Sequence, residues 1–191
     1  MKNNDRKEQI VKTAAQLFRE KGYNAVSMRD LAKDLGIKAA SLYNHISSKE
    51  AILAEVILST ARDFTEHIDN TFLEEKSSVK KLEEIIESHI DLTIEKANFV
   101  ACLNNDWMHL EEKNLNDYIK MRNHYESTLR KIIIKGMNLH EIEPQNPELI
   151  LFSLLSTLRT LYLWYPKNKH IEKSVLSKEL KNNLLKGIIT I

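Results

Sequence analysis

Residues that interrupt helices are scarce in this chain, which has four glycines and three prolines among 191 residues. In an average protein these two residue types together make up roughly 12% of the sequence. Leucine, isoleucine, lysine, glutamate and asparagine are abundant in their place. Few breakers and many helix formers predict an all-α fold.

The chain has a single cysteine, Cys102, which excludes an internal disulfide and any multi-cysteine zinc or iron–sulfur site. The charged first residues lack the apolar core of a signal peptide. The longest apolar stretch, residues 149–165, contains Arg159 and is shorter than the ~20 residues that cross a bilayer. We therefore expect a soluble cytoplasmic protein with no cofactor and no membrane partner.

Sequence motifs of enzymes are missing as well. The chain has no phosphate-binding glycine loop, no nucleophile elbow, no HExxH segment and no paired-carboxylate signature. Its seven histidines are scattered, and no two of them have the i, i+4 spacing of a helical metal site. We expect neither an enzyme nor a metal site.

Charge is distributed unevenly along the chain. Residues 1–50 contain ten Lys/Arg and six Asp/Glu, whereas the remainder contains eighteen and twenty-one. The N-terminal part is therefore basic and the rest is slightly acidic. This distribution favours the docking of a polyanion at the N-terminal end.

Apolar residues recur at helical spacing and divide the chain into about nine helices. The first four are expected at residues 5–21, 28–35, 39–45 and 48–73. The other five are expected at residues 79–96, 99–110, 115–139, 148–164 and 176–189. We predict a three-helix N-terminal head (residues 1–47), joined by the long fourth helix to a helical-bundle body (residues 48–191).

The segment from Met28 to His45 has the spacing of a helix-turn-helix. Small Ala32 is followed four residues later by Gly36 and six residues beyond that by the aliphatic Leu42. Gly36 allows the positive φ that reverses the chain between two short helices. Helical hairpins in ordinary bundles can share this spacing. A helical adaptor that does not bind DNA is therefore the alternative.

Residues 6–55 resemble the TetR family of bacterial regulators. In that family the second helix of the motif is followed by a Tyr-x-His-aromatic turn and a Ser-Lys-Glu start of the next helix. The matching residues here are Tyr43, His45, Ser48, Lys49 and Glu50. Two positions depart from the pattern, since Lys38 replaces a common serine cap and Ile46 replaces a common phenylalanine.

The resemblance implies a ligand-responsive transcription regulator that binds a palindromic operator in double-stranded DNA as a homodimer. Repression that a small-molecule inducer relieves is the usual outcome in the family, and activation stays open as an alternative. Coupling between inducer and DNA is expected to run through the fourth helix.

The third helix is short and begins with small residues, so it can enter a major groove end-on. The methyl groups of Ala39 and Ala40 are expected to contact thymine. Ser41 and Asn44 are expected to form hydrogen bonds with base edges or with phosphates.

Phosphate contacts are expected around this helix. The resemblance implies that Tyr43, His45 and Lys49 bind backbone phosphates and that Arg29 reaches a base or a phosphate. Free backbone amides at helix starts add further donors. The predicted DNA-binding set is Ser27, Arg29, Lys38, Ala39, Ala40, Ser41, Tyr43, Asn44, His45 and Lys49.

The helix at residues 148–164 is apolar around nearly its whole circumference and must be covered on all sides. The last helix carries a second apolar stripe, and the family pairs its last two long helices in a dimer. A core helix in a monomer is the alternative. The predicted dimer-interface set is Phe152, Leu155, Leu158, Leu180, Leu184 and Ile188.

The central helices carry aromatic side chains and methionine, and in the family this region encloses an inducer pocket. Arg159 lies among apolar residues and needs a partner. We expect either a carboxylate across the dimer, such as Asp106 or Glu126, or an anionic ligand. The predicted pocket set is Phe99, Trp107, His109, Met121, Arg122, Tyr125, Arg159 and Tyr162, although such residues are more often part of a core.

Residues 99–165 are similar to a subgroup of TetR bodies that respond to acyl-CoA thioesters. The similarity rests on a WxHLEE-like segment at residues 107–112, on an R-x-x-Y-E helix at residues 122–126, and on a late Trp-Tyr at residues 164–165. Met108 departs from the subgroup, where arginine is common at this position. The similarity implies that the inducer is an acyl-CoA or a hydrophobic carboxylic acid.

Overall fold

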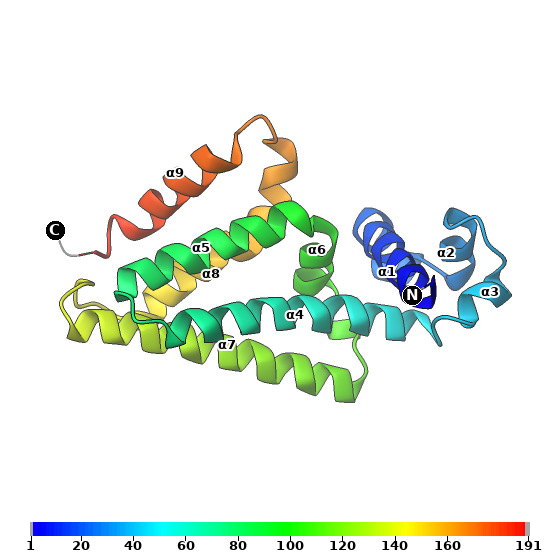
Figure 1. The fold of residues 1–191 in the computed structure, drawn as a ribbon, viewed down its shortest axis with the longest axis horizontal. Helices are drawn as coiled ribbons and strands as arrows, with labels where there is room; N and C mark the ends of the chain where they lie inside the picture. The colour runs from blue at the N-terminus through cyan, green and yellow to red at the C-terminus, as the bar shows by residue number, and fades with distance from the viewer. Residues whose placement is uncertain (1, 190–191) are drawn as a thin grey trace. The chain divides into compact units, whose positions relative to one another are not determined.

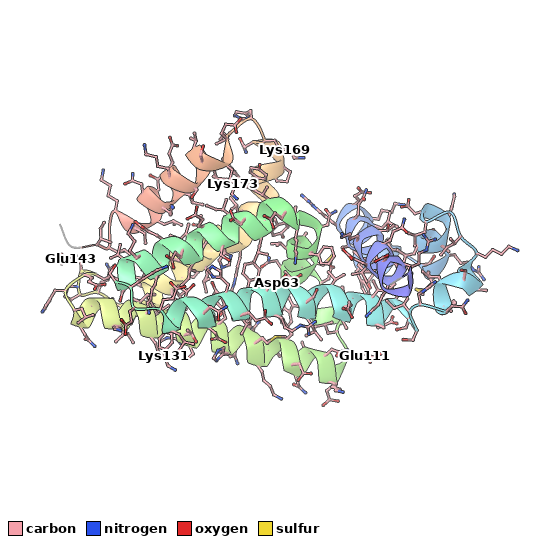
Figure 2. The ribbon with its side chains drawn as sticks, in the orientation of Figure 1. Asp63, Glu111, Lys131, Glu143, Lys169 and Lys173 are labelled. Carbon is pink, nitrogen blue, oxygen red and sulfur yellow. The ribbon has the colours of Figure 1, made fainter. Side chains whose placement is uncertain are left out.

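The computed structural model describes residues 2–189. Within this range the chain forms nine α-helices, three short 3₁₀-helices and no β-strand, which confirms the predicted all-α fold (Figure 1). None of the described helices is both long enough and apolar enough to span a membrane.

The first four helices follow the predicted order closely. They are α1 (Lys2–Lys21), α2 (Met28–Asp34), α3 (Ala39–Tyr43) and α4 (Lys49–Leu73), with η1 (Tyr23–Ala25) after α1. The α3 helix ends two residues before the predicted end, because the amides of Asn44 and His45 bond to the carbonyls of Ser41 and Leu42 in 3₁₀-type turns.

The remaining helices are α5 (Ser78–Glu95), α6 (Ala97–Asn105), α7 (Glu112–Asn138), α8 (Pro147–Trp164) and α9 (Lys173–Leu185). Two further 3₁₀-helices, η2 (Trp107–His109) and η3 (Tyr165–Lys167), follow α6 and α8. The expected sixth helix is therefore split in two, and the last helix begins and ends a few residues earlier than predicted.

The chain divides into two compact units. The first, called the head unit, contains the described residues up to Ala61 together with Lys96–Ile119. The second, called the body unit, contains Arg62–Glu95 and the described residues from Lys120 onward. The head unit thus includes α6 and η2 in addition to the helix-turn-helix. The boundary after residue 47 stays a prediction.

The head unit has a core built on α1. Ile10, Ala14 and Phe18 are almost fully buried there, and α1 packs against η1, α2 and α6. The thiol of Cys102 in α6 donates a long hydrogen bond to the Ala15 carbonyl, with a sulfur–oxygen distance of 3.7 Å. The buried apolar face of α1 therefore explains why α6 belongs to the head unit.

The body unit has a core in which α5 packs against α8 and α9. One polar pair lies inside it, since Nε2 of His89 is 2.8 Å from the Tyr125 hydroxyl. The ring of Phe64 lies 4.5 Å from the His89 ring, centroid to centroid. Burial, and then the charge of Arg159, lowers the pKa of His89 to about 3, so its imidazole is neutral.

The loop between α7 and α8 holds one end of the body unit together. A carboxylate oxygen of Glu141 accepts a hydrogen bond of 2.6 Å from the backbone amide of Ser78, at the start of α5. Gly136 of α7 is tightly enclosed, because a Cβ atom there would lie 2.6 Å from Ile142 and 2.8 Å from Ser78. Ile142 also forms an antiparallel bridge with Ile189 beyond α9.

Candidate nucleic-acid interface

Hydrogen bonds fix the start of α2, and a glycine forms the turn after this helix. The Ser27 hydroxyl accepts from the Asp30 amide at 3.2 Å, and the Asp30 carboxylate accepts from the Ser27 amide at 2.9 Å. These two bonds form a capping box. Gly36 has a φ of 65°, which confirms the left-handed turn between α2 and α3.

The short α3 helix has one buried and one exposed side. Leu42 is fully buried, which fixes the orientation of the helix. Ala40, Tyr43 and Asn44 are exposed and share one face, since residues three and four apart are neighbours on a helix. This face, called the α3 outward face, is available to a partner of the head unit.

The first turn of α4 is fastened to η1. The Ser48 hydroxyl accepts from the Ala51 amide at 3.0 Å and caps the helix. The Lys49 ammonium donates to the Tyr23 carbonyl at 3.1 Å and lies 4.2 Å from the centre of the Tyr23 ring. Lys49 therefore positions α4 against η1, and the phosphate contact expected for it stays a prediction.

Tyr23 links several parts of the head unit, and sequence reasoning missed it. Its hydroxyl lies 3.3 Å from a Glu50 carboxylate oxygen, and its ring stacks on His109 with centroids 5.1 Å apart. Burial, reinforced by the negative charge of Glu50, raises the pKa of Tyr23. The available signal was an aromatic residue directly after the glycine that ends α1.

A polar hollow of about 370 Å³ lies beside the α3 outward face. The segment from η1 to the start of α2, the start of α4 and Tyr43 line it. Its lining offers three serine hydroxyl groups, one ammonium and one carboxylate. Its lining is Asn24, Ala25, Val26, Ser27, Met28, Tyr43, Ser47, Ser48, Lys49 and Glu50.

The predicted DNA-binding residues all reach the surface of the head unit, and none of the ten is buried. The exposed residues are Ser27, Arg29, Lys38, Ala40, Tyr43 and Asn44. The half-buried residues are Ala39, Ser41, His45 and Lys49.

Two family models match this chain. The model of the bacterial regulatory proteins of the tetR family matches residues 10–56. The model of the tetracyclin repressor-like C-terminal domain matches residues 75–188, which is more than half of the chain. The chain belongs to the TetR family. It is thus a DNA-binding transcription regulator with a helix-turn-helix.

Several known regulators are similar to this chain. IcaR of Staphylococcus epidermidis, a negative regulator of a biofilm operon, is 28% identical over 130 residues, covering 64% of this chain and 70% of IcaR. The ketosteroid regulator KstR2 of Mycobacterium tuberculosis superposes with a TM-score of 0.92 at 17% identity, over 97% of this chain and 96% of KstR2.

AibR, solved with isovaleryl coenzyme A and operator DNA, superposes with a TM-score of 0.81 at 21% identity. The match covers 93% of this chain and 96% of AibR. At these identities KstR2 and AibR show a shared TetR fold.

The predicted inducer-pocket residues of this TetR-family chain fall into both units. Tyr125 and Tyr162 are buried, and the other six are half-buried. In the head unit, His109 stacks on Tyr23, and the Trp107 ring lies 5.8 Å from the Tyr118 ring. The head-unit members are Phe99, Trp107 and His109, and the body-unit members are Met121, Arg122, Tyr125, Arg159 and Tyr162.

Arg159 has its partner inside the same chain. Its guanidinium donates to a Glu126 carboxylate oxygen at 2.6 Å, and both side chains are partly exposed. Glu126 is one of the two expected carboxylates, but this pair lies within one chain and not across a dimer. The anionic ligand stays a prediction. The two residues meet because α7 and α8 both belong to the body unit.

The predicted dimer-interface residues divide by exposure. Leu155 and Leu158 are 3% and 1% exposed within the single chain. These two predictions need correction, because both side chains face the core of their own subunit. Phe152 is 68% exposed, and Leu180, Leu184 and Ile188 are half-buried. The exposed residues of α8 from Leu149 onward, called the α8 outward face, are Leu149, Phe152, Ser153, Ser156, Thr160, Leu163 and Trp164.

Proposed function

We propose that this protein is a repressor that binds a palindromic operator as a homodimer and leaves it when a small inducer binds. Residues 1–47 would form the DNA-binding domain, and residues 48–191 the ligand-binding and dimerisation domain. The observation that carries the proposal is the α3 outward face, with Ala40, Tyr43 and Asn44 exposed next to a polar hollow.

The two parts of this surface suit different parts of a duplex. The α3 outward face has the size of an element that enters the major groove, where base edges are read. Serine hydroxyl groups line the hollow, and exposed cations lie on α2, at Arg29, and just before α3, at Lys38. Such groups bind phosphates, which fix the register of the protein on DNA.

The α8 outward face supports the homodimer. Large apolar side chains stand at its two ends, with Phe152 68% and Leu163 54% exposed. Between them lie the small residues Ser153, Ser156 and Thr160, which allow close approach of a second helix. An apolar stripe of this kind is expected to be covered. Two-fold pairing also matches the palindromic operators that paired recognition helices bind.

The repressor role is supported by the negative regulation named for IcaR. The inducer would act through α4, whose residues Lys49–Ala61 belong to the head unit and whose residues from Arg62 to Leu73 belong to the body unit. A ligand that favours one tilt of α4 would change the spacing of the two recognition helices. Coupling of this kind is typically about 1–3 kcal/mol.

The inducer is proposed to be a small hydrophobic molecule, either an acyl-CoA or a hydrophobic carboxylic acid. The isovaleryl coenzyme A named for AibR supports the first class. Arg159 would receive the acidic group of the second, but its charge already pairs with Glu126. An anionic inducer would therefore have to displace the Glu126 carboxylate.

Selection of duplexes from a random DNA pool, followed by fluorescence anisotropy at several salt concentrations, tests DNA binding. We expect a palindromic site with two chains per duplex and an affinity that falls steeply with salt. An inducer panel of acyl-CoA thioesters and hydrophobic carboxylic acids should then release this duplex. Failure of the pool to yield any retained duplex would contradict the proposal.

Sedimentation tests the dimer. Phe152→Asp should convert the dimer into a monomer, because it places a charge among the large apolar side chains of the α8 outward face. Leu139→Asp is the matched control, since Leu139 is 55% exposed and lies outside that face. Equal effects of the two substitutions would show that the dimer uses another surface.

A further inference from the structure

We propose that the bases read by α3 are A·T pairs, with the Ala40 methyl group against thymine and the Asn44 amide on adenine. This inference rests on the proposed DNA binding and specifies which sequence is bound. It follows from the few side chains that form the α3 outward face.

The chemistry of this face is limited. Ala40 presents only a methyl group, which can contact the C5-methyl group of thymine. Asn44 presents an amide, which can accept from N6 and donate to N7 of adenine at the same time. Tyr43 is 54% exposed and lines the polar hollow, so its hydroxyl is better placed for a phosphate than for a base.

The same face lacks the groups that read guanine. Arginine and lysine are the usual partners of guanine O6 and N7, and residues 39–45 contain neither. Exposed cations lie at Lys38, which precedes the first turn of α3, and at Arg29 and Lys33 on α2. In a helix-turn-helix the first helix crosses the DNA backbone, so the α2 cations fit phosphates.

DNA selection from one random pool with three proteins tests the A·T assignment. The proteins are wild type, Asn44→Ala and Lys38→Ala. Wild type should retain half-sites with A·T pairs at the positions that α3 contacts. Asn44→Ala should lower the preference for one adenine about 5- to 150-fold. Lys38→Ala is the control and should weaken binding to all sequences, with the A·T preference unchanged. The salt slope, which is the slope of the logarithm of the binding constant against the logarithm of salt concentration, should become smaller in magnitude by about 1.

Uracil tests the methyl contact. Replacing one thymine of the selected half-site by uracil removes only a methyl group and should weaken wild-type binding about 3- to 5-fold. Ala40→Gly should bind the two duplexes equally. Each ratio is measured on one protein, so a loss of helix stability cancels.

The outcomes separate this inference from the proposed function. Selected half-sites with G·C pairs under α3, or base preferences that Asn44→Ala leaves unchanged, would overturn the A·T assignment while DNA binding stands. A thymine-to-uracil ratio that persists in Ala40→Gly would overturn the role of Ala40. A pool that yields no retained duplex would overturn both proposals.

Discussion

The imidazole of His89 lies 2.8 Å from the hydroxyl of Tyr125, and both groups are buried in the body unit. The folded histidine stays neutral down to a pH near its lowered pKa of about 3. An unfolded histidine takes up a proton near pH 6.5. Below pH 6.5 the unfolded state therefore binds an additional proton, and acid destabilises the fold through this residue.

We predict that the free energy of unfolding falls between pH 6.5 and pH 4 by on the order of 1 kcal/mol per pH unit from His89. Above pH 7 this contribution is constant. His89→Gln retains an amide that can bond to Tyr125 but does not titrate. Urea unfolding at several pH values should therefore give a smaller slope of the free energy of unfolding against pH for this variant. Exposed His170→Gln is the control and should retain the wild-type slope. Equal slopes in all three proteins would contradict the prediction.

Gly136→Ala should destabilise the body unit, although alanine is normally the better helix former. The added methyl group would meet Ile142 at 2.6 Å and Ser78 at 2.8 Å. Overpacking of this kind costs about 1–3 kcal/mol. Gly187→Ala is the matched control, because nothing lies within 4 Å of a Cβ there. Thermal unfolding that is unchanged in Gly136→Ala would show that the loop after α7 shifts easily.

Tyr43→Ala and Lys49→Ala should distinguish a side chain that contacts DNA from one that holds α4 against η1. Tyr43 is 54% exposed, so its loss should weaken operator binding and leave the free energy of unfolding unchanged. Lys49→Ala removes a hydrogen bond and a cation–π contact to Tyr23, and it should cost about 1–2 kcal/mol of stability.

Chemical denaturation and anisotropy on the same samples measure both effects. If Lys49→Ala retains wild-type stability but reduces the salt slope of DNA binding, Lys49 acts as the phosphate ligand that the sequence suggests.

Glu126→Gln should strengthen the binding of an anionic inducer. The Arg159 guanidinium donates a hydrogen bond to the Glu126 carboxylate. Replacing this carboxylate by a neutral amide would make the guanidinium available to the ligand. A hydrogen bond to a charged group is worth about 1.5–3 kcal/mol, so we expect about a tenfold gain for a hydrophobic carboxylic acid in calorimetry. A neutral ligand of similar shape should gain nothing. A similar gain for both ligands would show that Glu126 acts by shape and not by charge.

The head could be predicted in detail because its signals are local. The capping box at Ser27, the reversal at Gly36 and the cap at Ser48 each depend on residues that are close in sequence. Such short-range patterns determine helix ends almost by themselves. The exposed face of α3 followed from the same pattern.

Contacts between distant segments could not be predicted in this way. The stacking of His109 on Tyr23 joins residues 86 positions apart, and nothing in either local pattern indicates it. The apolar circumference of α8 predicts that Leu155 and Leu158 lie in a dimer interface. The sequence does not show that α5 covers one of these sides from within the same chain.

The thiol of Cys102 is fully buried under α1, and burial raises its pKa, which makes it a poor nucleophile. Since it is the only cysteine, every molecule that a thiol-specific reagent labels must have reacted there. The rate of alkylation therefore reports directly on how often α1 and α6 separate. A comparison of this rate with and without operator would measure how strongly bound DNA stabilises the packing of α1 on α6 in the head unit.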